Sequence, residues 1–225
     1  MRNIIMEKHI VSKKYPRAFL TGCDEDHAWM LPWFMENYKK HNDTPIVFAD
    51  FGCSEETLKW VEGQFHAIVK FKNNDLKGWF MKPLAMATAP IVETVWIDTD
   101  CEVHTDISGI FKLIKNEKLL MAEDKPWSWR RKETWHNSGV VGFRNTPQIL
   151  RSWLEQVKAA PRVGDQEVLH SMLNPISRMT YIEDLPQEYN WLRLQLVDGI
   201  DSPNRKITHW TGPKGKDHIR SLMNG

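Results

Sequence analysis

The amino-acid sequence predicts one three-layer α/β/α domain built around a mainly parallel, mixed sheet. Apolar runs typical of buried strands alternate with helical patterns along most of the chain, and this alternation favours parallel strands joined by crossover helices. A length of 225 residues and a mass of 26.4 kDa allow one substantial core and are short for two. We therefore expect an N-terminal extension over residues 1–16 and a single domain over 17–225.

Four strand patterns and three helical patterns fill the first half of the chain. The strands are expected over Ala18–Thr21, Pro45–Ala49, Ala67–Phe71 and Thr94–Ile97. The first helix spans about Trp29–Tyr38, and Pro32 requires it either to begin nearby or to kink. Ser54 can cap the second helix, because its side chain can accept from backbone amides of the first turn. A third helix over 78–89 ends before Pro90.

The second half begins with a segment, residues 122–136, that is rich in tryptophan and arginine and has no clear period. We interpret this segment as a loop or flap. A regular alternation then returns. We expect a strand over Val140–Phe143, helices around Ile149–Ala159 and Gln166–Leu173, and a last strand near Ile207.

The composition narrows the class of protein. The 30 basic and 29 acidic residues give a net charge of +1, so no long-range field attracts nucleic acid or an anionic membrane, and we expect no nucleic-acid partner. The three cysteines, an odd number without a CxxC pair, favour a reducing compartment. Because no apolar stretch fits a signal peptide or a transmembrane segment, we expect a soluble, cytoplasmic protein.

One strand pattern ends in two carboxylates one residue apart, Asp98 and Asp100. Ligands of open parallel sheets bind beyond the carboxyl ends of the strands, which is where these side chains fall. Carboxylate oxygens suit a hard divalent cation, and two carboxylates so close repel one another unless a cation lies between them. For so short a motif, a solvated acidic turn is the alternative.

His209 ends the last expected strand and begins the sequence HWTGPK. A lone histidine at such a position is often an ordinary core or surface residue. Here it is followed, in what we expect to be one loop, by Gly212, which permits close backbone approach, and by Lys214; that combination suits a metal-bound diphosphate. Two carboxylates and one imidazole would suit manganese, with magnesium as the alternative ion.

From about Arg17 to Lys216 the chain resembles family 8 of the retaining glycosyltransferases, the class of glycogenin and the bacterial lipopolysaccharide galactosyltransferases. The motifs that carry the resemblance, beside the two aspartates, are Asn137-Ser138-Gly139, Gly164-Asp165-Gln166 and His209-Trp210-Thr211-Gly212. The resemblance implies a GT-A fold and a UDP-sugar donor. It also implies a manganese site formed by Asp98, Asp100 and His209.

The resemblance extends to further residues. It implies that the donor sugar is lined by Asn137, Ser138, Gly139, Asp165 and Gln166, and that Lys82 lies near the diphosphate. The remaining expected donor contacts are Thr21, Thr99, Gly212, Lys214 and Lys216, in addition to the two aspartates. The chain departs from the family at Gly215, where a lysine is usual, so either neighbouring lysine could reach the diphosphate. The family's base-stacking tyrosine is also missing, although His27 and Trp29 are nearby.

The expected chemistry follows from the leaving group. Charge builds on a phosphate oxygen as the glycosidic bond breaks, and a divalent cation with Lys82 would stabilise it. Gln166 is a poor nucleophile and a good hydrogen-bond partner, which favours front-face attack by an acceptor hydroxyl over a covalent intermediate, while Asp165 would hold sugar hydroxyls. We expect transfer of a hexose to a glycan, lipid-linked or protein acceptor, and the resemblance implies retention of anomeric configuration. Trp129 is the candidate for stacking on an acceptor sugar, and Asp124 could contact either substrate or be a solvated loop acid.

Two other functions remain open at this point. A nucleotidyltransferase that makes sugar nucleotides would need a glycine-rich, basic loop after the first strand, whereas residues 21–26 are acidic. A non-catalytic module that binds a sugar nucleotide or a glycan would keep the fold without turnover, and the intact set of metal-binding residues argues against it. The donor sugar, the acceptor and the oligomeric state also stay open.

Overall fold

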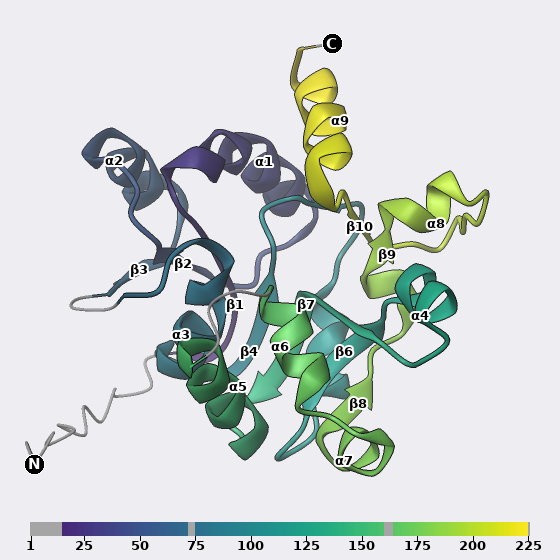
Figure 1. Ribbon diagram of the computed structural model, residues 1–225. Coiled ribbons are helices and arrows are strands. Elements are labelled where there is room, and N and C mark those ends of the chain that lie inside the picture. The colour runs from purple at the N-terminus through teal and green to yellow at the C-terminus, as the bar shows by residue number, and fades with distance from the viewer. Residues whose placement is uncertain (1–14, 72–74, 160–163, 225) are drawn as a thin grey trace, which may run out of the picture.

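A computed structural model describes residues 15–71, 75–159 and 164–224 of the chain (Figure 1). The strands are β1 (Tyr15–Cys23), β2 (Ile46–Asp50), β3 (Ala67–Lys70), β4 (Ile91–Ile97), β5 (Cys101–Val103), β6 (Leu119–Glu123), β7 (His136–Arg144), β8 (Ile182–Asp184), β9 (Trp191–Leu192) and β10 (Ile207–His209). The α-helices are α1 (Leu31–His41), α2 (Glu55–Gln64), α3 (Met81–Thr88), α4 (Lys125–Arg131), α5 (Gln148–Ala159), α6 (Asp165–Ser171), α7 (Pro175–Tyr181), α8 (Arg193–Val197) and α9 (Gly212–Asn224). Four short 3-10 helices are η1 (Glu25–Met30), η2 (Gly78–Phe80), η3 (Ser108–Leu113) and η4 (Gln187–Tyr189). In these described ranges, no helix has both the length and the apolar character needed to cross a membrane.

The central sheet has seven strands in the order β3-β2-β1-β4-β7-β6-β8. The first four of these pair in parallel, and β8 is parallel to β6. Strand β7 runs antiparallel to both of its neighbours, β4 and β6. The predicted mainly parallel, mixed sheet is therefore confirmed.

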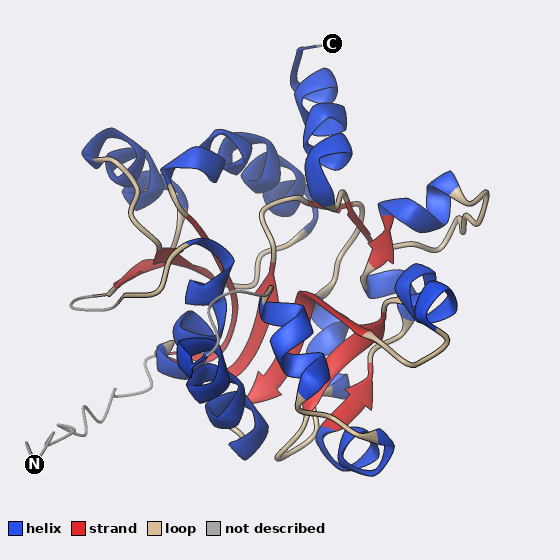
Figure 2. Ribbon diagram, in the orientation of Figure 1, coloured by secondary structure: helices blue, strands red, loops and turns tan. Residues whose placement is uncertain are grey.

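Helices cover both faces of this sheet (Figure 2). One face packs against α1 and α2 in a core that includes Phe19, Phe34 and Phe48. The other face packs against α3, α5 and α6 in a second core that includes Leu20 and Trp153. Because successive strand residues point to opposite faces, the neighbours Phe19 and Leu20 enter different cores. The predicted three-layer α/β/α architecture is confirmed.

Local signals account for several helix ends. The backbone N–H of Thr57 donates to Ser54 Oγ at 3.2 Å, so Ser54 caps α2 as predicted. Pro32 lies in the first turn of α1, which begins at Leu31 after the 3-10 helix η1, so the helix begins near the proline as one of the two expected outcomes.

The interpretation of residues 122–136 as a loop or flap was wrong in part. The segment contains the end of β6, the helix α4 and the start of β7. Asp124 caps α4 by accepting from the backbone N–H of Trp127 at 3.1 Å, and Lys132 ends it in the left-handed conformation, with φ of 57°. A helix of seven residues is too short to show a helical period in the sequence.

The loop expected after His209 is shorter than predicted. Residues from Gly212 onward form α9, so Lys214 lies in a helix. A second, three-stranded sheet, in the order β5-β10-β9, joins residues that follow Asp98 and Asp100 to the strand that ends at His209. These strands have two or three residues each, which is why their pairing has no visible sequence pattern.

Gly22 allows β1 and β2 to approach closely, so a larger residue at this position should destabilise the fold. A Cβ at Gly22 would lie 2.4 Å from the carbonyl oxygen of Ala49. We expect Gly22→Ala to lower the free energy of unfolding by about 1–3 kcal/mol, because the strand backbones must separate. The matched control is Gly63→Ala on α2, where a Cβ meets nothing within 4 Å and should stabilise the helix by about 0.5–1 kcal/mol. Urea denaturation of both variants measures this, and equal effects would contradict it.

Candidate active site

Two adjoining cavities lie beyond the carboxyl ends of the central strands. The first, of about 180 Å³, has an apolar lining that includes Met30, Phe51 and Trp96. The second, of about 400 Å³, is lined mainly by polar side chains from β7, α6 and β10. The residues shared by both linings are Trp79, Lys82, Asp98 and Asp100. A ligand with an aromatic part and a polar part could therefore occupy both cavities, with its middle beside the two aspartates.

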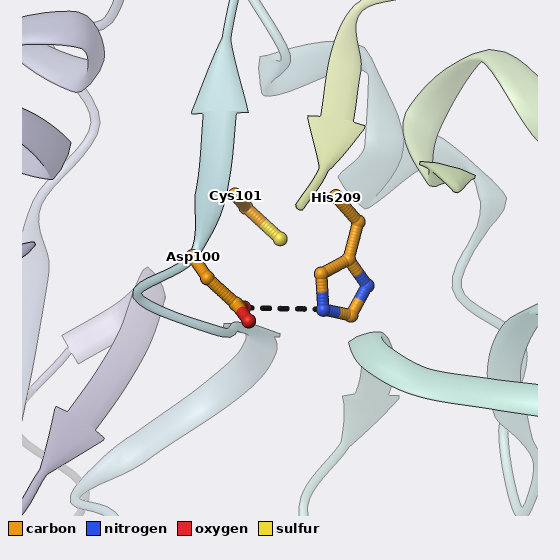
Figure 3. A group of neighbouring side chains, drawn as sticks. All are labelled: Asp100, Cys101 and His209. Atoms are coloured by element: carbon orange, nitrogen blue, oxygen red, sulfur yellow. Dashed lines mark ion pairs between the residues drawn. The ribbon is translucent and has the colours of Figure 1, made fainter. Parts of the chain in front are cut away.

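The structure brings the two aspartates of the DxD motif and His209 together. His209 Nε2 lies 3.1 Å from an oxygen of Asp100 and 3.7 Å from an oxygen of Asp98. Figure 3 shows Asp100, which lies just before β5, facing His209 at the end of β10. Burial disfavours the charged imidazole, but Asp100 outweighs this and raises the pKa of His209 above its usual value. Burial likewise opposes the Asp100 carboxylate, yet His209 and Lys216 together lower its pKa.

The second nitrogen of His209 is held by two asparagines. Nδ1 lies 3.1 Å from Asn137 Oδ1 and 3.2 Å from Asn190 Oδ1. Asn137 Oδ1 also accepts from the backbone N–H of Gly139, which fixes that atom as oxygen. In the neutral imidazole Nδ1 therefore carries the proton and donates it, which leaves the Nε2 lone pair directed at the carboxylates.

This donor set tests whether a divalent cation fits. Two carboxylates and an imidazole lone pair converge, and such acceptor atoms repel one another unless a proton or a cation lies among them. A histidine whose distal N–H is held by an amide oxygen is the usual arrangement for a metal ligand. Asp98, Asp100 and His209 thus fit a manganese or magnesium ion by their chemistry.

Cys101 is close to the same site (Figure 3). One ligand atom from each of Asp100, Cys101 and His209 lies within 4.8 Å of the other two. Burial raises the pKa of the Cys101 thiol well above its usual value, so the thiol stays protonated. A protonated thiol is a poor ligand for a hard cation.

Lys82 is buried between two carboxylates, Asp98 after β4 and Asp165 of α6, and beside Ser138 of β7. Its Nζ lies 3.0 and 3.1 Å from the two oxygens of Asp98 and 3.4 Å from Asp165, and donates to Ser138. Burial opposes its charge, but Asp165 and Asp98 outweigh this and raise the Lys82 pKa. Lys82 is therefore a fixed positive charge beside the DxD motif. Its place near the N-terminus of α3 is as expected.

A hydrogen-bonded group joins β7, α4 and α6. Asp124 Oδ2 accepts from the side-chain amides of Asn137 at 3.2 Å and Gln166 at 3.3 Å. Gln166 Oε1 in turn accepts from the backbone N–H of Ser138, and Ser138 Oγ donates to Asp165. Asp124 is buried and so is not a solvated loop acid. All five side chains line the second cavity.

The third residue of the Asn-Ser-Gly motif, Gly139, must lack a side chain because it packs against His209. A Cβ at Gly139 would lie 2.0 Å from Cε1 and 2.3 Å from Nδ1 of His209. Only glycine lets β7 pass so close to the imidazole.

Of the other predicted residues, some line one of the two cavities and some line neither. Thr99 and Lys216 line the first cavity, and Gly212 lines the second. Lys216 Nζ lies 3.4 Å from Asp100, whereas Lys214 is exposed and borders neither cavity, so of the two lysines only Lys216 is brought to the site. Thr21 is fully buried in β1 and borders neither cavity; its neighbours Gly22 and Cys23 line the first one.

Some residues of the site were missed. Trp96 Nε1 donates to Asp98 Oδ1 at 2.6 Å. Residues two apart in an extended segment point to the same side, so the spacing of Trp96 and Asp98 could have indicated this contact. Asn190 is fully buried, and its side-chain amide donates to Asn137 Oδ1. His27 lines the first cavity and Trp29 does not.

Comparison with solved structures agrees with this architecture. The galactosyltransferase LgtC, solved with donor and acceptor sugar analogues, is similar with a TM-score of 0.66 and 14% identity, over 92% of this chain and 95% of LgtC. The glycosyltransferase GlyE of Streptococcus pneumoniae TIGR4 has a TM-score of 0.68 and 17% identity over 88% of this chain. The chain has the GT-A glycosyltransferase fold. The implied GT-A fold is thus confirmed.

The similarity has limits in length and in sequence. The chain spans 55% of GlyE and 46% of the bifunctional glycosyltransferase WbbM, which matches with a TM-score of 0.62 at 10% identity. No protein-family model and no curated protein sequence matches the chain. Another LgtC structure has an active-site glutamine replaced by glutamate. Gln166 lines the second cavity of the present structure.

Proposed function

We propose that the chain is a metal-dependent glycosyltransferase that moves a hexose from a UDP-sugar to an acceptor hydroxyl. The observation that supports this most directly is the meeting of Asp98, Asp100, His209 and Lys82 at the junction of an apolar and a polar cavity, within a fold shared with sugar transferases. The nucleoside would lie in the first cavity and the sugar in the second.

The residues at the junction have distinct roles in this proposal. Asp98, Asp100 and His209 would hold a manganese or magnesium ion, which supplies positive charge for a departing diphosphate. Lys82 of α3 and Lys216 of α9 contact Asp98 and Asp100 respectively. Their side chains add positive charge beside the proposed metal site and are not themselves metal ligands. Preorganised charge of this kind lowers the barrier because it requires no rearrangement as the negative charge develops.

The residues of the second cavity would hold the sugar. Asp165 and Asn137 offer hydrogen-bond partners for hydroxyls, and Gln166 is fixed by Asp124 and the backbone of Ser138. An amide cannot act as a strong nucleophile, which supports direct front-face attack by the acceptor and retention of configuration. The active-site glutamine of LgtC supports the same assignment for Gln166.

The alternatives differ in measurable ways. A non-catalytic module would bind the donor without releasing products. A nucleotidyltransferase would form or consume a nucleoside triphosphate, and the first cavity has acidic Asp24 where such an enzyme needs basic groups.

The decisive experiment measures nucleoside diphosphate released from a panel of UDP-, GDP-, ADP- and dTDP-sugars, with manganese, magnesium or a chelator. We expect manganese-dependent release from one UDP-hexose, and loss of that release with chelator. Tight donor binding without release would favour the binding module, and release unaffected by chelator would contradict the role of the metal.

A further inference from the structure

The second cavity extends beyond the residues assigned to the donor, and its outer wall has a different character. That wall contains Trp127 of α4 with Leu192 and Leu194, which lie at the end of β9 and the start of α8. We propose that this wall is the acceptor site and that it binds an uncharged pyranose, whose C–H face stacks on the Trp127 ring. This inference rests on the proposed glycosyltransferase function.

The Trp127 ring is held rigidly. The Arg131 guanidinium lies over it, 4.9 Å from the ring centre, and Trp135 meets it edge-on with centroids 6.3 Å apart. Arg131 covers one face of the indole and Trp127 lines the second cavity, so the proposal assigns the opposite face to the acceptor. A fixed, half-buried indole beside a polar cavity is suited to the amphipathic ring of a sugar.

Helix α4 is tied to the proposed donor-sugar site by Asp124. One oxygen of Asp124 caps α4 at Trp127, and the other accepts from Asn137 and Gln166. The other end of α4 is tied to the residue after α8, because Arg130 pairs with Asp198 at 3.3 Å. The stacking surface therefore has a fixed position relative to Gln166, as an acceptor platform needs.

The charges of the wall favour an uncharged acceptor. Arg130 and Arg131 are engaged with Asp198 and Trp127, and neither borders the cavity. The outer lining instead includes the exposed carboxylate of Glu167, which would repel an acidic sugar and can accept from hydroxyls. The basic triplet at residues 130–132 therefore does not make this wall a site for an acidic acceptor.

Trp129, the tryptophan favoured by the sequence, provides a matched control. It lies two residues away on the same helix, is 78% exposed and does not line the cavity. With the donor identified by the release assay, transfer to methyl hexopyranosides and lactose is measured at saturating donor. We expect Trp127→Ala to raise the acceptor KM at least tenfold, Trp127→Phe to stay near wild type, and Trp129→Ala to change it less than twofold.

A binding measurement on the wild-type fold covers the case in which Trp127→Ala does not fold. The protein is labelled with 5-fluorotryptophan, and the resonances of residues 127 and 129 are assigned with the two phenylalanine variants. Methyl hexopyranosides should shift the Trp127 resonance and leave that of Trp129 in place.

The outcomes separate the two proposals. If no donor releases nucleoside diphosphate, the proposed function fails and the acceptor site fails with it. If transfer occurs but the acceptor KM of Trp127→Ala is unchanged and the Trp127 resonance does not shift, only the acceptor site is overturned. Transfer to a serine or tyrosine peptide, or to a methyl glucuronide, in preference to every neutral pyranoside also overturns it.

Discussion

Changing Asp100 to asparagine is expected to lower manganese-dependent release of nucleoside diphosphate by at least about 100-fold. Asparagine keeps nearly the same shape but removes the charge that faces His209 Nε2 at 3.1 Å and Lys216 Nζ at 3.4 Å. The site then offers a hard cation one carboxylate in place of two, and a neutral amide oxygen is a weaker ligand.

Two readouts make this first prediction specific. Manganese binding, followed by electron paramagnetic resonance of the free ion, should weaken in parallel with activity. The charge-matched control is Asp43→Asn, an exposed residue in the loop after α1, which should change neither quantity by more than twofold. Full release by Asp100→Asn, or unaltered manganese affinity, would show that this carboxylate does not hold the ion.

The second large effect concerns stability. Lys82→Met is expected to lower the free energy of unfolding by about 3–5 kcal/mol, because it leaves buried Asp165 and half-buried Asp98 without the cation that compensates them. Methionine keeps the length and the apolar stem of the side chain, so the loss reports the charge. Denaturant unfolding of the metal-free protein measures it.

A double-mutant cycle tests the cause of that loss. Asp165→Asn in the Lys82→Met background removes one uncompensated charge, and we expect it to restore about 1–3 kcal/mol. The control is Lys158→Met, which breaks an exposed pair with Glu155 and should change stability by less than about 0.5 kcal/mol. If Lys82→Met is as stable as the wild type, the lysine is not needed to neutralise the buried acids.

The layers of the fold and the position of the two aspartates could be predicted from the sequence alone. The buried parts of β1 and β4 contain short runs of apolar residues, at 18–20 and 95–97, and such runs are visible in the sequence without knowledge of the neighbouring strands. Because parallel strands end at one edge of a sheet, the position of Asp98 and Asp100 after β4 followed from the same patterns. The Ser54 cap of α2 and the start of α1 near Pro32 depend on residues close together in the chain, so they too could be predicted from the sequence.

Tertiary structure alone decided which side chains meet at that edge. The sequence could not choose between Lys214 and Lys216, because the choice depends on the orientation of α9, whose side chains project in different directions around the axis. Likewise, Trp127 and Trp129 look alike in the sequence, and only the packing of α4 turns the first toward the cavity and the second toward solvent. The hydrogen bonds from His209 to Asn137 and Asn190 join three distant segments. Strands β9 and β10, beside Asn190 and ending at His209, have two and three residues and are too short to leave a periodic signal.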